Sequence, residues 1–254
     1  MTRPAVLVTG GAKRIGAVLA RAFADEGWHI VIHYGTSEDA ARELADELPS
    51  ARIVQCDLRD GDAAEAMVEG LSHELADWRC LVNCAAVFDP DDVADLDPDT
   101  SEKAMQVNAL SPVRLAQAYL RAAKASAGRR VIQFLDQKIA NPNPDFFSYT
   151  MAKHAAAGAV PMLAMGATKD ADRIYGLAPG AILASHDQSE EETEISHRLN
   201  PLKRKTGANE IASAALFLAH GHLADGETLF VDSGQHLLAQ DRDVIYLARR
   251  GETP

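Results

Sequence analysis

Short runs of apolar residues recur along the chain, and the longer segments between most of them repeat apolar residues at helical spacing. The short runs predict strands at Val6–Thr9, His29–His33, Arg52–Cys56, Cys80–Cys84, Val131–Leu135, Arg173–Leu177 and Thr228–Val231. The longer segments predict helices at Ala17–Ala24, Glu38–Leu48, Asp62–Leu75, Val107–Ala123, Tyr149–Ala167 and Asn209–Ala219. Strands that alternate with helices pair in parallel, so we expect an α/β fold with a doubly wound parallel sheet of about seven strands and helices on both faces.

Two polar segments interrupt this alternation, Val87–Thr100 and Pro179–Thr193. Both follow predicted strand ends, where doubly wound sheets bind their ligands, so we expect substrate loops near 87–100 and 179–200. Their acidic residues, taken alone, indicate a solvated surface. The sequence has 254 residues and is 47% apolar, which is enough for one large core. We therefore predict a single domain over 1–254, with a C-terminal tail from 235 to 254.

The turn after the first predicted strand reads TGGAKRIG, from Thr9 to Gly16. Glycine lets a ligand approach the backbone, and the N–H groups and dipole of the following helix favour a negative charge. Such a turn also forms simply to connect a strand to a helix, but the adjacent cations Lys13 and Arg14 favour a phosphate ligand. Together with the alternating elements, the turn predicts a dinucleotide-binding domain of the Rossmann type.

The formal net charge of −12 disfavours nucleic acids and membrane surfaces as partners, because both are polyanionic. A small-molecule substrate is favoured instead. Cys56, Cys80 and Cys84 are odd in number and lie in apolar strand-like contexts, which indicates reduced thiols in a cytoplasmic protein. No apolar run reaches the ~20 residues that span a bilayer, and the scattered histidines lead us to assign no metal site.

Several short motifs occur in an order and spacing that is specific in combination, although each is commonplace alone. The combination resembles the short-chain dehydrogenases/reductases over nearly the whole chain. The motifs are Thr9-Gly10-x-x-x-Arg14-x-Gly16, Asn83-Cys84-Ala85-Ala86, Asn108, Tyr149-x-x-x-Lys153 and Pro179-Gly180.

The Tyr149–Lys153 spacing suits proton transfer, because residues one turn apart share a helix face. We expect the Lys153 ammonium to lower the pKa of the Tyr149 phenol from its usual value near ~10. The resemblance makes Tyr149 the proton donor that accompanies hydride transfer from a reduced nicotinamide, and it gives Asn108 a water in the proton relay.

The end of the second predicted strand bears on the choice of cofactor. Proteins of this fold that prefer NAD place an acidic residue there for the ribose hydroxyls, whereas here the strand end continues through His33–Ser37 before the first acid, Glu38. A 2′-phosphate would not be repelled, so we predict NADPH. Arg14 and Lys13 are expected to compensate phosphate charge, although Lys13 alternatively faces water. By the resemblance, Asp57 accepts a hydrogen bond from the adenine amino group. The predicted cofactor contacts are Gly10, Lys13, Arg14, Ile15, Gly16, His33, Tyr34, Gly35, Thr36, Ser37, Asp57, Leu58, Asn83, Ala85, Pro179 and Gly180.

One departure from the family pattern indicates a particular subgroup of the family. The serine that usually precedes the tyrosine is replaced by Asp136 in the stretch QFLDQKIA. An aspartate here, with AKRIG and YTMAK, resembles the pteridine reductases, including enzymes that reduce dihydromonapterin and dihydrofolate. Phe88 matches the aromatic residue that stacks on the pterin ring in that subgroup. Ala86 stands where the subgroup commonly has serine, and Tyr175 where asparagine is usual, and both leave substrate orientation open.

These residues predict an NADPH-dependent reductase of a dihydropteridine, dihydromonapterin or dihydrofolate, with Tyr149, Lys153, Asp136 and Asn108 as catalytic residues and Phe88, Asp136 and Tyr149 as substrate contacts. A general NADPH-dependent carbonyl reductase is the alternative. A carboxylate beside a developing alkoxide would be unfavourable, whereas a pterin nitrogen accepts a proton. A cofactor-binding regulator without activity is a third hypothesis.

Two segments suggest packing beyond the core. Ala155–Ala167 is apolar on nearly all sides, so we expect this helix to be buried around its circumference, either within the chain or against a second copy. Family members pair this helix across a two-fold axis, which predicts a homo-oligomer, a dimer or tetramer. Pro161 is expected to kink or loosen it. Asp241–Arg250 carries apolar residues that need cover, so we expect it near the substrate pocket or on a neighbouring subunit, with Arg249 or Arg250 in contact, a frayed tail being the alternative.

Overall fold

A computed structural model describes residues 3–185 and 188–250 of the chain. A seven-stranded parallel sheet has the order β3-β2-β1-β4-β5-β6-β7, so the predicted fold class is confirmed. Residues 186–187, in one predicted substrate loop, and 251–254, in the predicted tail, lie outside the described residues. The strands are β1 (Ala5–Val8), β2 (His29–Tyr34), β3 (Ala51–Gln55), β4 (Trp78–Asn83), β5 (Arg130–Phe134), β6 (Arg173–Pro179) and β7 (Thr228–Val231).

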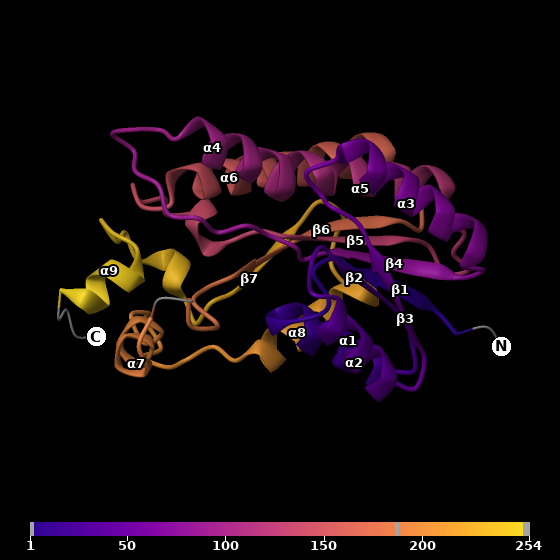
Figure 1. Cartoon of the computed structure of the whole chain (residues 1–254), viewed down its shortest axis with the longest axis horizontal. Coiled ribbons are helices and arrows are strands. Elements are labelled where there is room, and N and C mark those ends of the chain that lie inside the picture. Colours follow the sequence, from indigo (N-terminus) through magenta and orange to yellow (C-terminus); the bar gives the residue numbers. More distant parts are fainter. Residues whose placement is uncertain (1–2, 186–187, 251–254) are drawn as a thin grey trace.

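Helices cover both faces of the sheet (Figure 1). One face carries α1 (Arg14–Asp25), α2 (Glu38–Glu47) and α8 (Ala208–Ala219). The other carries α3 (Gly61–Glu74), α4 (Pro98–Met105), α5 (Ser111–Ala122) and α6 (Phe147–Ala167). Successive strand residues alternate between the two cores, as Leu7 packs under the second set and Val6 and Val8 under the first.

The first predicted substrate loop is shorter than expected. The predicted helix Val107–Ala123 is preceded by α4, which starts at Pro98 after the capping residue Asp97, and a π-turn over Gln106–Leu110 joins α4 to α5. The prediction failed because the polar first turn of α4 has no apolar periodicity, although Asp97 followed by Pro98 is a common helix start.

The second predicted loop contains another unpredicted helix, α7 (Glu190–Ser196), with a capping box between Ser189 and Glu192. Beyond the sheet, α9 (Val244–Arg249) lies beside α7 at one end of the molecule (Figure 1). Short 3₁₀ turns at Gln137–Ile139 and Gln235–Leu237 complete the described elements. None of the helices in the described part of the chain is long and apolar enough to cross a membrane.

Helix α6 is not buried on all sides within one chain, so its cover by a second copy stays a prediction. Its inner face packs into the core through residues such as Ala156 and Leu163, but Met162 and Met165 remain 62% and 83% exposed. An apolar composition therefore does not lead to complete burial within one chain. The helix continues through Pro161 as one α-helix.

Candidate active site

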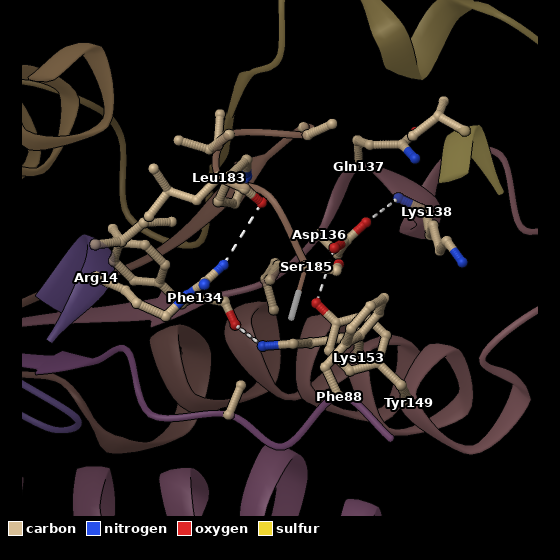
Figure 2. Close-up of a pocket in the computed structure, with 18 of the residues that line it drawn as sticks. Arg14, Phe88, Phe134, Asp136, Gln137, Lys138, Tyr149, Lys153, Leu183 and Ser185 are labelled. Atoms are coloured by element: carbon tan, nitrogen blue, oxygen red, sulfur yellow. Dashed lines mark hydrogen bonds between the residues drawn. The ribbon is translucent and has the colours of Figure 1, made fainter. Parts of the chain in front are cut away.

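A cavity of about 430 Å³ opens at the carboxyl ends of the strands, where the order of the sheet reverses around β1 and β4. It brings together residues far apart in the sequence (Figure 2). Its lining includes the predicted site residues Gly10, Lys13, Arg14, Ile15, Gly16, Ala85, Phe88, Asp136, Tyr149, Lys153, Pro179 and Gly180. The remaining predicted site residues lie outside this lining.

The glycine turn forms one end of the cavity. Gly10 has a φ of +62°, and a Cβ atom there would lie 3.0 Å from the Ala85 Cα atom. A Cβ atom on Gly16 would lie 2.1 Å from the Gly10 carbonyl oxygen, so the turn and helix pack too closely for a side chain. Within the described part of the chain, the N-cap residue Lys13 makes no side-chain hydrogen bond to the first turn of α1, and residues 13–16 line the cavity. The first amides of this helix are therefore suited to bind an anion there.

Arg14 spans the cavity from this turn to the segment after β6. Its Nη2 atom donates to the Ala184 carbonyl oxygen at 2.9 Å. The same atom lies 3.5 Å from the Leu183 carbonyl oxygen (Figure 2). The side chain is exposed, as is that of Lys13. Both cations thus stand at the solvent side of the glycine turn, in reach of a ligand that occupies it.

His33 braces the glycine turn, in contrast to its predicted role as a cofactor contact. The Gly10 N–H donates to His33 Nδ1 at 3.1 Å, and Nε2 lies 3.1 Å from the Cys56 carbonyl oxygen. Burial lowers the pKa of His33 to about 4, so the ring is neutral at pH 7 and donates from Nε2. Both ring nitrogens are used inside the protein, and neither is left for a ligand.

The other second-strand and third-strand residues differ in exposure. Tyr34 is buried, whereas Gly35 and Thr36 are exposed and stay predicted cofactor contacts, with Ser37 partly buried beside them. Asp57 is paired with Arg59, with a closest distance of 2.6 Å. This pairing holds the pKa of the Asp57 carboxyl below its usual value.

Three predicted site residues use their polar groups within the scaffold. The Leu58 carbonyl oxygen accepts a hydrogen bond from Ser111 Oγ at 2.6 Å. Asn83 Nδ2 donates to the Pro112 carbonyl oxygen and to Gln133 Oε1, both at 3.0 Å. Asn108, in the π-turn, accepts from the Val87 N–H and donates to the Val87 carbonyl oxygen, both at 2.9 Å. The Asn108 side chain therefore anchors the loop that carries Phe88, and its place in a proton relay stays a prediction.

Tyr149 and Asp136 meet inside the cavity. The Tyr149 hydroxyl donates to Asp136 Oδ2 at 2.8 Å, while the Lys138 N–H donates to Asp136 Oδ1 at 2.9 Å (Figure 2). Desolvation raises the pKa of Asp136 despite the opposing charge of Lys138. The two groups thus form one hydrogen-bonded pair, with the proton on the Tyr149 oxygen and Asp136 as the acceptor.

The expectation that Lys153 lowers the pKa of Tyr149 is wrong for this structure. Burial of the phenol, together with the negative charge of Asp136, raises the pKa of Tyr149 well above its usual value. Lys153 Nζ donates instead to the Phe134 carbonyl oxygen at 2.6 Å and lies 5.5 Å from the centroid of the Tyr149 ring. Burial lowers the pKa of Lys153 to about 8. Tyr149 is consequently a protonated acid at neutral pH.

Aromatic rings line the cavity beside this pair. Phe88 stacks on Phe146 with ring centroids 4.0 Å apart and meets the edge of Tyr149 at 4.7 Å. The loop with Phe88 is tied to the start of α6, which carries Tyr149, because the Ser148 N–H donates to Asp91 Oδ2 at 3.0 Å. Phe146, which precedes α6, has a φ of +53°, in the left-handed region that large residues avoid. The loop and the first turn of α6 therefore hold Phe88 and Tyr149 in fixed relation.

Asp243, Val244 and Ile245 line the cavity, in agreement with the expectation that Asp241–Arg250 lies near the substrate pocket. As Asp243 precedes Val-Ile-x-Leu-Ala, the sequence there shows a capping residue followed by apolar residues at helical spacing. His197, in the predicted substrate loop 179–200, also lines the cavity. Burial lowers the pKa of His197 to about 4, so a neutral imidazole borders the cavity. Lys138 is a lining residue that was not predicted, and nothing in the sequence pattern indicates that it faces the cavity.

The glycine turn, the Tyr149–Lys153 pair and the parallel sheet define a reductase or dehydrogenase of the short-chain class. A family model described as Enoyl-(Acyl carrier protein) reductase matches residues 10–236. The chain belongs to the short-chain dehydrogenase/reductase family.

Within this family, the similarity to the pteridine reductases is confirmed. Pteridine reductase 1 of Leishmania tarentolae is 28% identical over an alignment of 282 residues with its gaps, and the alignment covers 93% of this chain and 97% of that protein. FolM alternative dihydrofolate reductase 1 from Brucella suis, solved in complex with NADP, is 31% identical, with a TM-score of 0.87 and coverage of 94% of this chain and 96% of that one. The 7alpha-hydroxysteroid dehydrogenase of Escherichia coli strain K12 is 27% identical over 237 residues, covering 90% of this chain and 92% of that protein. Overall identity therefore does not separate pterin from steroid substrates.

Proposed function

We propose that the protein is an NADPH-dependent reductase that transfers a hydride to a pterin-type substrate: a dihydropteridine, dihydromonapterin or dihydrofolate. The observation that carries the proposal is the 2.8 Å hydrogen bond from Tyr149 to Asp136. It places a carboxyl group against the proton donor of the family, where reduction of a carbon–nitrogen double bond needs a proton for nitrogen. The half-buried Phe88 ring supplies an aromatic surface beside the same pair.

The residues at the glycine turn fit a phosphorylated cofactor. The uncapped α1 terminus offers amide donors, and Gly10 and Gly16 leave no side chain between them and the cavity. Arg14 and Lys13 add positive charge, and no acidic side chain lies among Gly35, Thr36 and Ser37 to repel a 2′-phosphate. The FolM structure in complex with NADP supports the same choice. When bound, NADPH supplies the hydride.

The protein's own groups supply and hold the proton. Tyr149 keeps its phenolic proton at neutral pH, because its pKa is raised, and its hydroxyl reaches the cavity beside Phe88. It can donate this proton to the substrate nitrogen that gains electron density on hydride transfer. After this transfer, Asp136 can take up a proton from water in the cavity and return it to the Tyr149 oxygen, which lies 2.8 Å from Asp136 Oδ2. Lys153, held by the Phe134 carbonyl group, stabilises the developing phenolate with its charge.

Single-turnover oxidation of bound NADPH tests the proposal, with dihydrobiopterin, dihydromonapterin, dihydrofolate and a panel of ketones as acceptors. We expect rapid oxidation with at least one dihydropterin or dihydrofolate and slower oxidation with the ketones. Faster turnover of a ketone would identify a general carbonyl reductase. Binding of NADPH without oxidation by any acceptor would favour a regulator.

Arg14→Ala should weaken NADPH binding. Loss of one charge-assisted phosphate contact costs about 1.5–3 kcal/mol, or roughly tenfold to over a hundredfold in affinity. NADH, which lacks the 2′-phosphate, provides the comparison ligand in fluorescence titrations. Arg21→Ala is a matched control, because Arg21 lies on the same helix but is paired with Glu47 at 2.7 Å outside the cavity. Equal or tighter binding of NADH than of NADPH by the unmodified protein would contradict the cofactor proposal.

We further propose a homo-oligomer, a dimer or tetramer, and a cytoplasmic location. The exposed Met162 and Met165 of α6 support assembly, because a second copy of this helix would cover them. The free thiols of Cys56, Cys80 and Cys84 support a reducing compartment. Sedimentation that shows only monomer at micromolar concentration would refute the oligomer.

A further inference from the structure

A buried ion pair joins the active-site wall to the C-terminal segment. Lys138 Nζ lies 2.7 Å from Asp243 Oδ2, and the two side chains are only 4% and 7% exposed. The Lys138 ammonium also donates to the Asp145 carbonyl oxygen at 3.1 Å and to Asn143 Oδ1 at 3.2 Å. Both members of the pair line the cavity that contains Asp136. Such a pair carries a large penalty when one partner is lost, because the other charge is left buried and uncompensated.

A second set of contacts holds the same segment. The Asp243 N–H donates to Asp145 Oδ2 at 2.7 Å, and the Arg242 guanidinium binds the Asp145 carboxylate with a closest distance of 2.6 Å. Arg242 also lies over the Tyr246 ring, 4.8 Å from its centroid, and Tyr246 is stacked on Phe146 at 6.0 Å. The start of α9 is therefore attached to the stretch just before the catalytic helix.

This attachment brings apolar residues of α9 to the reacting groups. Ile245 packs in one cluster with Phe146 and Tyr149, and Phe88 packs against that cluster. Val244 and Ile245 line the cavity together with Tyr149. The α9 helix thus supplies a wall of the cavity although it lies far from Tyr149 in the sequence.

We propose that the Lys138–Asp243 ion pair is a positioning device that holds α9 against the catalytic pair, and that Ile245 on α9 is a specificity-determining contact of the substrate. The assignment of the substrate contact rests on the proposed reductase function, whereas the anchoring of α9 does not. Lys138 connects α9 to the catalytic pair, because its backbone N–H donates to Asp136 while its ammonium is paired with Asp243.

Asp243→Asn removes the ion pair with Lys138 but keeps the cap of α9. Asp243 Oδ1 accepts from the Ile245 N–H at 3.1 Å, a bond that asparagine can also accept, so α9 keeps its cap but loses the charge partner of Lys138. We expect hydrogen exchange of the amides in 244–250 to become about tenfold faster or more, because the helix detaches more often. We also expect KM for the reduced substrate to rise roughly tenfold, with kcat changing less and the Kd of NADPH unchanged.

Asp172→Asn is the matched control. Arg129 and Asp172 form another buried pair, at 2.6 Å and with side chains 9% and 4% exposed, in contacts remote from the cavity lining. This variant should lower the melting temperature without changing KM. Ile245→Ala is the second test variant: it leaves both charges in place and should raise KM roughly tenfold, as the loss of apolar contact in a pocket does.

The possible results distinguish failure of the α9 attachment, here called the anchor, from failure of the proposed reductase function. If the unmodified enzyme reduces no pterin, the proposed function fails, KM is measured with whichever ketone it reduces, and hydrogen exchange with NADPH alone still tests the anchor. Unchanged exchange in Asp243→Asn would overturn the anchor. Faster exchange with unchanged KM would overturn the role of α9 at the substrate. If Asp243→Asn does not fold, an Ile245→Ala enzyme with unchanged KM would still overturn the assignment of Ile245 as a substrate contact.

Discussion

Tyr149→Phe should lower the single-turnover rate of substrate reduction by roughly 10²–10⁴, the usual contribution of a general acid. Phenylalanine keeps the ring and its perpendicular contact with Phe88, but it removes the hydroxyl that donates to Asp136 at 2.8 Å. The substrate nitrogen would then have to take its proton from water or from Asp136 at a longer distance. NADPH affinity, measured by fluorescence titration, should remain within about twofold of the unmodified protein.

Tyr175→Phe controls for the loss of a buried phenol. The Tyr175 hydroxyl donates to the Leu223 carbonyl oxygen at 2.7 Å and does not line the cavity. This variant should lose about 0.5–1.5 kcal/mol of stability and keep its rate. A Tyr149→Phe enzyme that reduces substrate at the unmodified rate would show that another group donates the proton.

Asp136→Asn should keep the fold and the NADPH affinity while lowering the rate of dihydropterin reduction by roughly 10²–10⁴. Asparagine can still accept from the Lys138 N–H through its oxygen, as Asp136 Oδ1 does at 2.9 Å. Its amide group, however, would face the Tyr149 hydroxyl as a donor and could not return a proton to it. The two carboxylate oxygens of Asp136 thus have separate contacts: Oδ1 with the Lys138 N–H and Oδ2 with the Tyr149 hydroxyl. Only the contact with Tyr149 should be disturbed.

Melting temperatures measured beside the rates distinguish a catalytic role for Asp136 from support of its own loop. Asp97→Asn is a suitable control, since Asp97 likewise accepts from a backbone N–H, that of Thr100 at 3.0 Å, outside the cavity. If Asp136 only supports the loop, any effect of Asp136→Asn should appear in the melting temperature, and the rate should depend little on the substrate. An undiminished rate with dihydropterins would remove Asp136 from the mechanism.

Asp136→Ser tests whether Asp136 determines the class of substrate that the enzyme reduces. It restores the residue usual in the family and places a neutral hydroxyl near the atom where a ketone would develop negative charge. Dihydropterin reduction should fall, while ketone reduction should stay the same or improve. Single-turnover rates with both acceptor classes measure this change, and equal losses for both would show that Asp136 does not discriminate between them.

The periodic apolar pattern was sufficient to predict the parallel sheet, because a buried strand and an amphipathic helix each impose a spacing on their own residues. Predicted strands such as His29–His33 agree with the observed β2 to within one residue. The starts of α4 and α7 were missed because their first turns are polar. Helix termini depend on capping hydrogen bonds, and these leave a weaker pattern than burial.

The sequence also determined the chemical groups of the site, since a glycine turn, a tyrosine–lysine pair on one helix and an aspartate at a strand end are each recognisable from spacing. Only the tertiary structure decided how these groups affect one another. It places the His33 ring in a hydrogen bond with the glycine turn. It also buries Tyr149 beside Asp136, and both effects raise the pKa of Tyr149 although Lys153 lies on the same helix. It also brought Asp243 and Ile245 to the cavity from the far end of the chain. Desolvation and charge–charge interactions depend on distance in space, and spacing along the chain determines that distance only within a single helix or strand.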